Sequence, residues 1–216
     1  MKKSVSTSST GNVRTTDYVY DGNKIVSATT NSLKINYFYT NDLISKIEFR
    51  YNQIVSNTLL LTYDNSQKLI EKTATSDSQQ VVKEIFQYNT DGTISSTATV
   101  TSQDSDSIVE NSKYFLGSSG EIVTREVYNS AGTQITTYSY DTKNNLFKNV
   151  LNMNKLLQFD SNVFNCTGYQ ASRNGVVSNS STSQFTYNSN DFPVTNTSTT
   201  INGSTTSSFT IQHFYE

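Results

Sequence analysis

The stretch YVYDGNKIV, residues 18–26, indicates the fold because the same phrase recurs along almost the whole chain. It returns as YFYTNDLIS (37–45), LTYDNSQKLI (61–70), FQYNTDGTIS (86–95), YSYDTKNNLF (138–147) and FTYNSNDFPV (185–194). Shorter variants are FRYNQIVS (49–56) and VYNSAGTQI (127–135). An internal repeat predicts an architecture built from one recurring structural unit.

Each phrase has the chemistry of a β-hairpin. Tyr18 and Tyr20 lie two residues apart, so on a strand they share one face, while Val19 points the other way. Asp21-Gly22 then supplies residues that tolerate the backbone angles of a tight turn. Ile25 restarts the chain as an aliphatic residue. The phrase therefore predicts the end of one strand, a turn and the start of the next.

The spacing of the phrases predicts the fold class. Tyr39, Tyr51 and Tyr63 are twelve residues apart, close to the roughly 8–12 residues that one strand and its turn occupy. We expect one all-β domain over residues 1–216, with residues 1–12 open to being a flexible segment. It is a long antiparallel meander of roughly 12–16 strands, curled into a twisted strip or an open, barrel-like sheet. Residues 73–82 and 100–108 are expected to be extended loops or long hairpin tips.

Composition favours a thin β structure over disorder. Hydrophobic residues make up only 34% of the chain, but aromatic residues make up 12% and the net charge is −2, whereas disorder pairs low hydrophobicity with high charge. Without a basic cluster, the chain is not expected to bind nucleic acid. Its longest apolar run, Leu59-Leu60-Leu61, is far too short for a transmembrane helix.

The surface chemistry, rich in Ser, Thr and Asn with little charge, is typical of exported bacterial β proteins. Residues 4–10 are polar and form no signal peptide. We therefore expect a periplasmic, outer-membrane-anchored or secreted protein whose export signal is absent from this chain.

The phrase is interrupted between residues 146 and 164. Phe147, Val150, Leu151 and Leu156 are spaced like one or two helical turns, while three asparagines weaken a longer helix. We predict a short helical or irregular plug over residues 146–159. The plug either covers an edge of the sheet or acts as a mobile lid over a groove; both alternatives stay open.

Few residues suggest chemistry, and we predict no catalytic, cofactor-binding or metal-binding residue. His213 is the only histidine, on an alternating strand with Phe209 and Ile211. Asp104-Ser105-Asp106 lacks the glycine and the distal glutamate of a calcium loop. Cys166 is the only cysteine and is expected to be a small buried residue.

The tyrosines have two readings, as an internal ladder or as a platform for a ligand. They recur together with the turn, which favours the ladder. Middle positions of the phrase, such as Phe38, are better candidates for an exposed contact.

The phrase Tyr-x-Tyr-Asp-x-x-Gly/Asn-x-Leu/Ile resembles the YD repeat of the Rhs and teneurin type. It is also similar to short exported YD-like proteins, often lipoproteins, of Flavobacteria and related Bacteroidetes. Residues 18–25, 86–94 and 138–146 carry the resemblance most clearly. The resemblance implies antiparallel hairpins in series and no particular reaction.

These observations predict a non-enzymatic exported scaffold or binding module of the cell envelope, whose partner is a glycan or another envelope protein. One alternative is a carbohydrate-active enzyme or lid-gated binding protein with a groove near residues 146–164. That enzyme would need acids such as Asp141 and Asp160 brought together by the fold. A purely structural adhesin segment is the third alternative. The sequence gives no oligomeric state.

Overall fold

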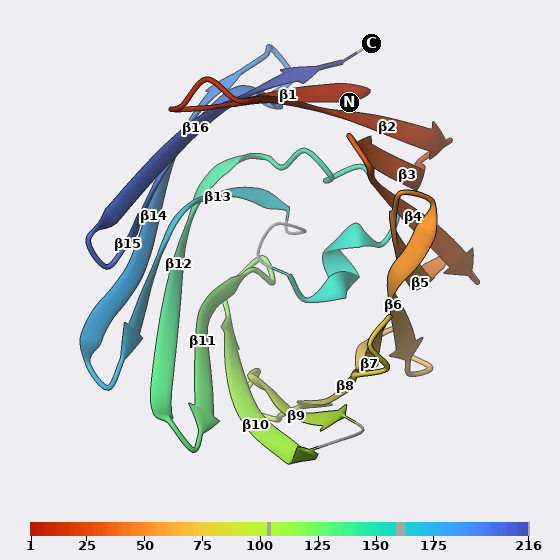
Figure 1. Ribbon diagram of the computed structural model, residues 1–216, viewed down its shortest axis with the longest axis vertical. Helices are drawn as coiled ribbons and strands as arrows, with labels where there is room; N and C mark the ends of the chain where they lie inside the picture. Colours follow the sequence, from red (N-terminus) through yellow and green to blue (C-terminus); the bar gives the residue numbers. More distant parts are fainter. Residues whose placement is uncertain (103–104, 159–162, 216) are drawn as a thin grey trace.

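The computed structural model shows a closed antiparallel β-barrel of sixteen strands with a plug inside it (Figure 1). It describes residues 1–102, 105–158 and 163–215; for residues 102 and 105–108 it describes only the backbone. The strands are β1 (Lys3–Ser8), β2 (Val13–Asp21), β3 (Lys24–Thr30), β4 (Leu33–Thr40), β5 (Leu43–Tyr51), β6 (Ile54–Tyr63), β7 (Leu69–Ser76), β8 (Val81–Tyr88), β9 (Ile94–Ser102), β10 (Ser105–Leu116), β11 (Ile122–Asn129), β12 (Gly132–Asn144), β13 (Phe164–Arg173), β14 (Val176–Tyr187), β15 (Pro193–Asn202) and β16 (Thr205–Phe214). The predicted all-β meander of serial hairpins is confirmed.

The two ends of the chain close the barrel. Every strand pairs with its neighbours in sequence, and β1 pairs with both β2 and β16. The β1–β16 register runs from Lys3 opposite Phe214 to Ser8 opposite Phe209. Closure leaves no exposed sheet edge, so the wall offers no template for pairing with another chain. Residues 3–8 are thus part of the wall.

In a meander, alternate turns lie at the same end of the barrel, and this places all the full phrases together. The turns after β2, β4, β6, β8, β12 and β14 each follow one copy of the phrase. We call this end the plug end and the opposite one the far end. The short variants FRYNQIVS and VYNSAGTQI lie at the far end. The described residues of 73–82 and 100–108 lie at the tips of the hairpins β7–β8 and β9–β10, so they form hairpin tips that are largely strand and not extended loops.

The phrase also encodes a bulge that the sequence pattern did not reveal. Strand registers shift between Val19 and Tyr20, and at the equivalent steps before Tyr39, Tyr63, Tyr140 and Tyr187. The extra residue lies in the following strand, as Val26 does in β3. A bulge bends the strand and increases its twist. Repetition of the bulge around one rim therefore helps to curl the strip into a ring.

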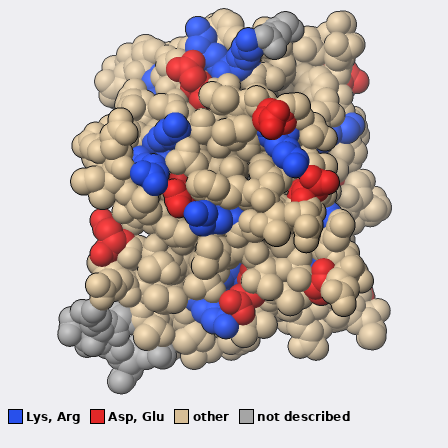
Figure 2. Space-filling model, turned by 90° about the vertical axis from the view of Figure 1, so that its right-hand side faces the viewer, with Lys and Arg blue, Asp and Glu red and all other residues tan. Residues whose placement is uncertain are grey.

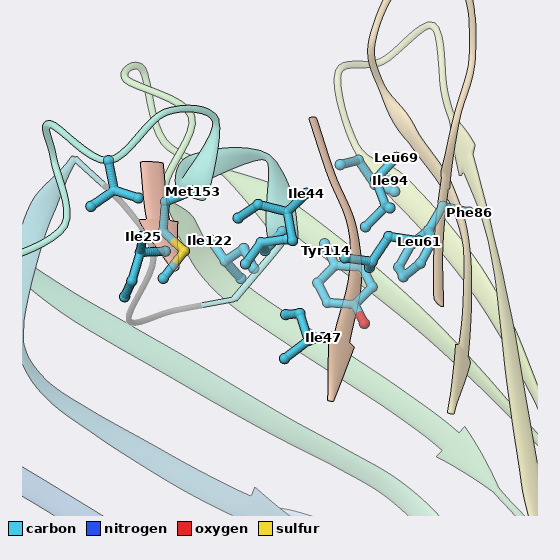
Figure 3. Close-up of a cluster of buried hydrophobic side chains, with 12 residues drawn as sticks. Ile25, Ile44, Ile47, Leu61, Leu69, Phe86, Ile94, Tyr114, Ile122 and Met153 are labelled. Atoms are coloured by element: carbon cyan, nitrogen blue, oxygen red, sulfur yellow. The ribbon is translucent and has the colours of Figure 1, made fainter. Parts of the chain in front are cut away.

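The aliphatic residues after the turns form the core inside the barrel. Ile25, Ile44 and Leu69 have no exposed surface, and Ile94 is 1% exposed. In the second phrase, YFYTNDLIS, the aliphatic residue that points inward is Ile44. Leu43 pairs with the outward Thr40 and therefore points outward as well. Figure 3 shows these side chains with Met153 of the plug among them.

The predicted plug is confirmed as a short helical segment with irregular flanks. It contains a 3₁₀ helix, Met153–Leu156, which buries both Met153 and Leu156. The plug is held to the rim by three hydrogen bonds. The Leu151 amide donates to the Asn23 carbonyl at 2.8 Å. The Asn152 side chain donates to the Asp42 carbonyl at 3.1 Å, and Lys155 Nζ donates to Gln67 Oε1 at 2.6 Å. A sixteen-stranded barrel is wide enough to leave a channel, and residues 146–158 occupy that space at the plug end.

The outer wall carries charge on one side and hydroxyl groups on the other. Lys46, Glu48 and Arg50 point outward from β5 and pair at 2.9 and 3.2 Å. Figure 2 shows Lys, Arg, Asp and Glu side chains of both signs spread over the face that includes these strands. On β14–β16 the outward positions are almost all Thr, Ser or Gln: Ser180, Thr182, Gln184, Thr186, Thr195, Thr197, Thr199, Ser208, Thr210 and Gln212.

Candidate functional site

A ladder of hydrogen bonds runs around the plug end. It contains the second tyrosine of four phrases and Tyr215 after β16, whereas Tyr187 donates to the Asp141 carboxylate instead. Each hydroxyl in this tyrosine ladder bonds the backbone of the first inward residue after the preceding plug-end turn. The Tyr63 hydroxyl donates to the Ile44 carbonyl at 2.9 Å, and the Tyr39 hydroxyl accepts from the Ile25 amide at 3.2 Å. The other members are Tyr88 with Leu69, Tyr140 with Ile122 and Tyr215 with Pro193. The tyrosines are half-buried and inward, so the ladder interpretation is confirmed for these rings.

The ladder breaks where the barrel closes. Tyr20 belongs to the first phrase, and no turn at the plug end precedes it in the described chain. Its hydroxyl has no hydrogen-bond partner among the described residues. Burial raises the pKa of Tyr20, and the neighbouring rings of Tyr18, Tyr37, Tyr39 and Tyr215 raise it further. Tyr20 is therefore a neutral hydroxyl that is free to bond a ligand.

A cavity of about 850 Å³ lies beside Tyr20, between the rim and the plug. We call it the mouth cavity. Tyr18, Tyr20, Tyr215 and Phe192 supply aromatic surface, and the remaining lining residues are Met1, Lys2, Val19, Gly22, Asn23, Leu146, Asn149 and Val150. Two contacts between rings position this aromatic surface. Tyr18 meets Phe147 edge to face at 6.0 Å, and Phe192 lies 6.1 Å from Tyr215.

A second cavity, of about 420 Å³, lies between the plug and the inner face of β13–β16. Leu146 lines both this cavity and the mouth cavity. Its other walls combine apolar rings and chains with small polar groups: Asn145, Phe147, Asn165, Cys166, Gly168, Tyr169, Ser181, Ser183, Phe185, Asn196, Ser198, Thr200, Phe209 and Ile211. The plug packs closely on β3–β11 and leaves this space on the opposite side.

His213 lies where its alternation predicts, facing inward on the strand that contains Phe209 and Ile211. It is 6% exposed, and neither ring nitrogen has a hydrogen-bond partner among the residues that the structure describes. Burial lowers the pKa of His213 to about 4. The ring is thus neutral at pH 7 and is not a residue of the mouth cavity.

The carboxylates considered for catalysis are not brought together as a described pair. Asp141 accepts hydrogen bonds from Lys143, Asn165 and Tyr187, which fix the base of the plug. Asp160 lies outside the described residues, as do Asp104 and the side chains of Ser105 and Asp106. Among the residues that are described, no three His, Cys, Asp or Glu side chains are grouped so that they could hold a metal ion.

Cys166 and Phe38, two single residues considered from the sequence, each contact a neighbouring group in the barrel wall. Cys166 is half-buried and its Sγ lies 3.4 Å from the Gly168 carbonyl. Phe38 is 39% exposed on the outer wall, as expected for a middle position, and Lys46 Nζ lies 4.0 Å from its ring centroid. No helix in the described part of the chain is long and apolar enough to cross a membrane.

The sequence analysis missed the mouth cavity because closure creates it. Its residues come from both ends of the chain, from the first phrase and from the plug. One signal was present: residues 146–164 interrupt the phrase, and Leu146, Asn149 and Val150 of that stretch line the cavity.

Comparison with known proteins supports the architecture. No family model matches the chain, and no curated protein does either. Several solved structures match, and two of them cover its whole length. One is a porin-like protein from Bacteroides vulgatus (14% identity, TM-score 0.63, 98% of that chain covered), and the other a porin-like protein from Bacteroides uniformis (8%, 0.60, 97%). At these identities the likeness shows the fold alone, and the resemblance to YD repeats stays a prediction. The chain thus shares the barrel fold of these porin-like proteins of Bacteroides.

Proposed function

We propose that the protein is a non-enzymatic binding module of the cell envelope that takes a glycan in the mouth cavity. The observation that carries the proposal is the unpartnered Tyr20 hydroxyl, which faces a cavity of about 850 Å³ between aromatic rings. A sugar offers apolar faces to rings and hydroxyls to polar groups. Tyr20, Asn23 and Asn149 supply such polar groups, and Tyr18, Tyr215 and Phe192 supply the rings.

The outer wall supports a barrel that stands in water. A lipid-facing wall needs an apolar band, and a Lys or Arg at its centre costs about 2–4 kcal/mol. Here some of the exposed apolar residues have charged neighbours across the strands: Leu60 lies opposite Lys46, and Ile85 lies opposite Glu71. An envelope location is also in keeping with the porin-like neighbours from Bacteroides. We propose a periplasmic, secreted or externally anchored barrel.

Binding can be followed without a label because the chain contains fourteen tyrosines and no tryptophan. Soluble oligosaccharides of bacterial and host type would be titrated into the protein, with calorimetry and tyrosine fluorescence as readouts. We expect one class to bind, and we expect Tyr20→Phe to weaken it two- to tenfold, the loss of about one neutral hydrogen bond.

Tyr128→Phe is the matched control, because Tyr128 is an exposed tyrosine on β11, outside the barrel. It should leave glycan affinity unchanged. The proposal fails if no glycan binds, or if a bound glycan keeps its affinity in Tyr20→Ala and in Phe192→Ala. If an envelope protein binds and no glycan does, the glycan proposal is wrong and the partner is a protein.

A further inference from the structure

A third cavity, of about 380 Å³, is lined by three charged side chains on the inner wall of β7–β11, with a fourth beside it, and shares no lining residue with the mouth cavity. Lys72, Glu84 and Arg125 line it, together with Tyr114, Ile122, Tyr138, Leu157 and Gln158. Glu110 lies beside it, 3.3 Å from Arg125 Nη2. We call it the charge cavity. These charges face inward, while Glu71 and Lys83 of the same two strands, β7 and β8, face outward.

The two cationic side chains, Lys72 and Arg125, can each bind a further group. Lys72 forms no ion pair within 4 Å among the described residues; its ammonium lies 5.1 Å from the centroid of the Phe86 ring. Arg125 Nη2 donates to Glu110 and Ser112, but Nη1 has no partner in the described part of the protein. The guanidinium is stacked 5.4 Å from the centre of Tyr114. An inward ammonium and one guanidinium nitrogen are therefore available to a ligand.

The anionic partner has one oxygen available as well. Glu84 Oε1 accepts hydrogen bonds from Ser96 at 2.7 Å and from Tyr114 at 2.9 Å. Oε2 accepts none from the described residues. These two hydroxyl donors hold the carboxylate in place and leave its second oxygen free.

The net charge of the cavity indicates which charge type of ligand it can bind. Lys72 and Arg125 contribute two positive charges, and Glu84 and Glu110 contribute two negative ones, so the cavity is neutral without a ligand. A bound anion or cation would leave one uncompensated charge in a partly buried site, which is costly. A zwitterion keeps the balance and pairs both of its ends.

We propose that the charge cavity binds a small zwitterion of the amino-acid class. Its carboxylate lies against Lys72 and Arg125, its ammonium against Glu84 Oε2, and its side chain against Tyr138 and Leu157. Arginine suits the carboxylate because its planar donors match carboxylate geometry. The site is independent of the glycan function.

The test compares ligands on the unaltered protein. Calorimetry with alanine, leucine and phenylalanine identifies the best amino acid. For phenylalanine, the analogues are 3-phenylpropionate, which lacks the ammonium, and phenethylamine, which lacks the carboxylate. We expect each analogue to bind about tenfold more weakly or worse, the loss of one charge-assisted contact. Equal binding of 3-phenylpropionate, or no binding of any amino acid, overturns the proposal.

Matched variants locate the site. Glu84→Gln keeps an acceptor for Ser96 and Tyr114 but removes the charge, so amino-acid affinity should fall about tenfold, while 3-phenylpropionate, whose charge then balances the site, should bind at least as well as before. Arg125→Met should weaken both. Glu71→Gln and Lys83→Met alter the same strands on the outer face and should change neither. Circular dichroism and melting confirm that each variant is folded. If Glu71→Gln weakens binding as much as Glu84→Gln does, the charge cavity is not the site.

Discussion

The two halves of the barrel wall, β3–β11 and β12–β16, are built from the same hairpin but face different contents. In β3–β11 the first inward residue after each plug-end turn is Ile or Leu, and all of these are 0–4% exposed against the plug. In β14–β16 the inward positions alternate Ser, Thr and Asn with Phe and Ile around the cavity of about 420 Å³.

The difference shows how one repeat can serve two purposes. The hairpin and its bulge are backbone features, so they persist in both halves. The inward side chain is free to vary, because closure of the ring depends on the hydrogen-bond ladder and not on every core contact. Stability is thus expected to reside mainly where Ile and Leu of β3–β11 pack on the plug. Open space remains in both halves, as the cavity of about 420 Å³ at β13–β16 and the charge cavity of about 380 Å³ at β7–β11.

The largest expected effect on stability comes from truncating one aliphatic side chain of the core. Ile44→Ala should lower the free energy of unfolding by about 2–5 kcal/mol, because the fully buried side chain packs in the core beside the plug. Ile211→Ala, which removes the same atoms beside an existing cavity, should cost less. Urea denaturation measures both. Equal costs would contradict the division into a packed half and an open half.

The hydroxyl-lined half should lose stability in mild acid because of His213. Its pKa is lowered from 6.5 to about 4 by burial, so the unfolded chain binds a proton more readily than the folded protein does. The contribution is fully present above pH 6.5 and is lost as the pH falls from 6.5 to 4. It amounts to no more than about 3 kcal/mol.

Melting temperature measured from pH 7 to pH 4 tests this expectation, with His213→Phe as the comparison. The variant should lack the part of the slope that lies between pH 6.5 and 4. An unchanged slope would show that other groups account for the acid sensitivity.

A smaller effect on stability is expected in the tyrosine ladder, where Tyr63 bonds the backbone and Tyr20 does not. Tyr63→Phe removes the donor to the Ile44 carbonyl and should cost about 1 kcal/mol. Tyr20→Phe removes a hydroxyl without a described protein partner and should cost almost nothing. Denaturation of the two variants measures this. A matching loss for Tyr20→Phe would mean that its hydroxyl already has a structural role.

The smallest expected effect is on the outer wall. Thr197→Lys places a charge in the middle of the hydroxyl face on β15 and should change stability by less than about 0.5 kcal/mol, as for other exposed sites. Lys46→Met, on the charged face, should be similarly mild. Detergent-free thermal melts provide the measurement. A loss of about 2–4 kcal/mol for Thr197→Lys in lipid, but not in water, would indicate a membrane-embedded wall.

The candidate site was only partly predictable from the sequence. The plug was expected because residues 146–158 lack the strand pattern. Lys72, Glu84 and Arg125 gave no signal, because in sequence they are ordinary charges on alternating strands. Glu71 and Lys72 are adjacent, and period-two alternation says that they face opposite sides but not which of them faces inward.

The sequence by itself determined that the chain forms serial hairpins with tyrosines on one face, because the two-residue alternation and the turn residues are local signals. Tertiary structure decided that β1 meets β16, that the tyrosine face is the inside, and that the plug lies against β3–β11. Those choices rest on contacts between residues about two hundred positions apart, such as Lys3 with Phe214. Closure creates the break in the tyrosine ladder at Tyr20, and the registers of β7–β11 bring Lys72, Glu84 and Arg125 around one space. No local pattern encodes either.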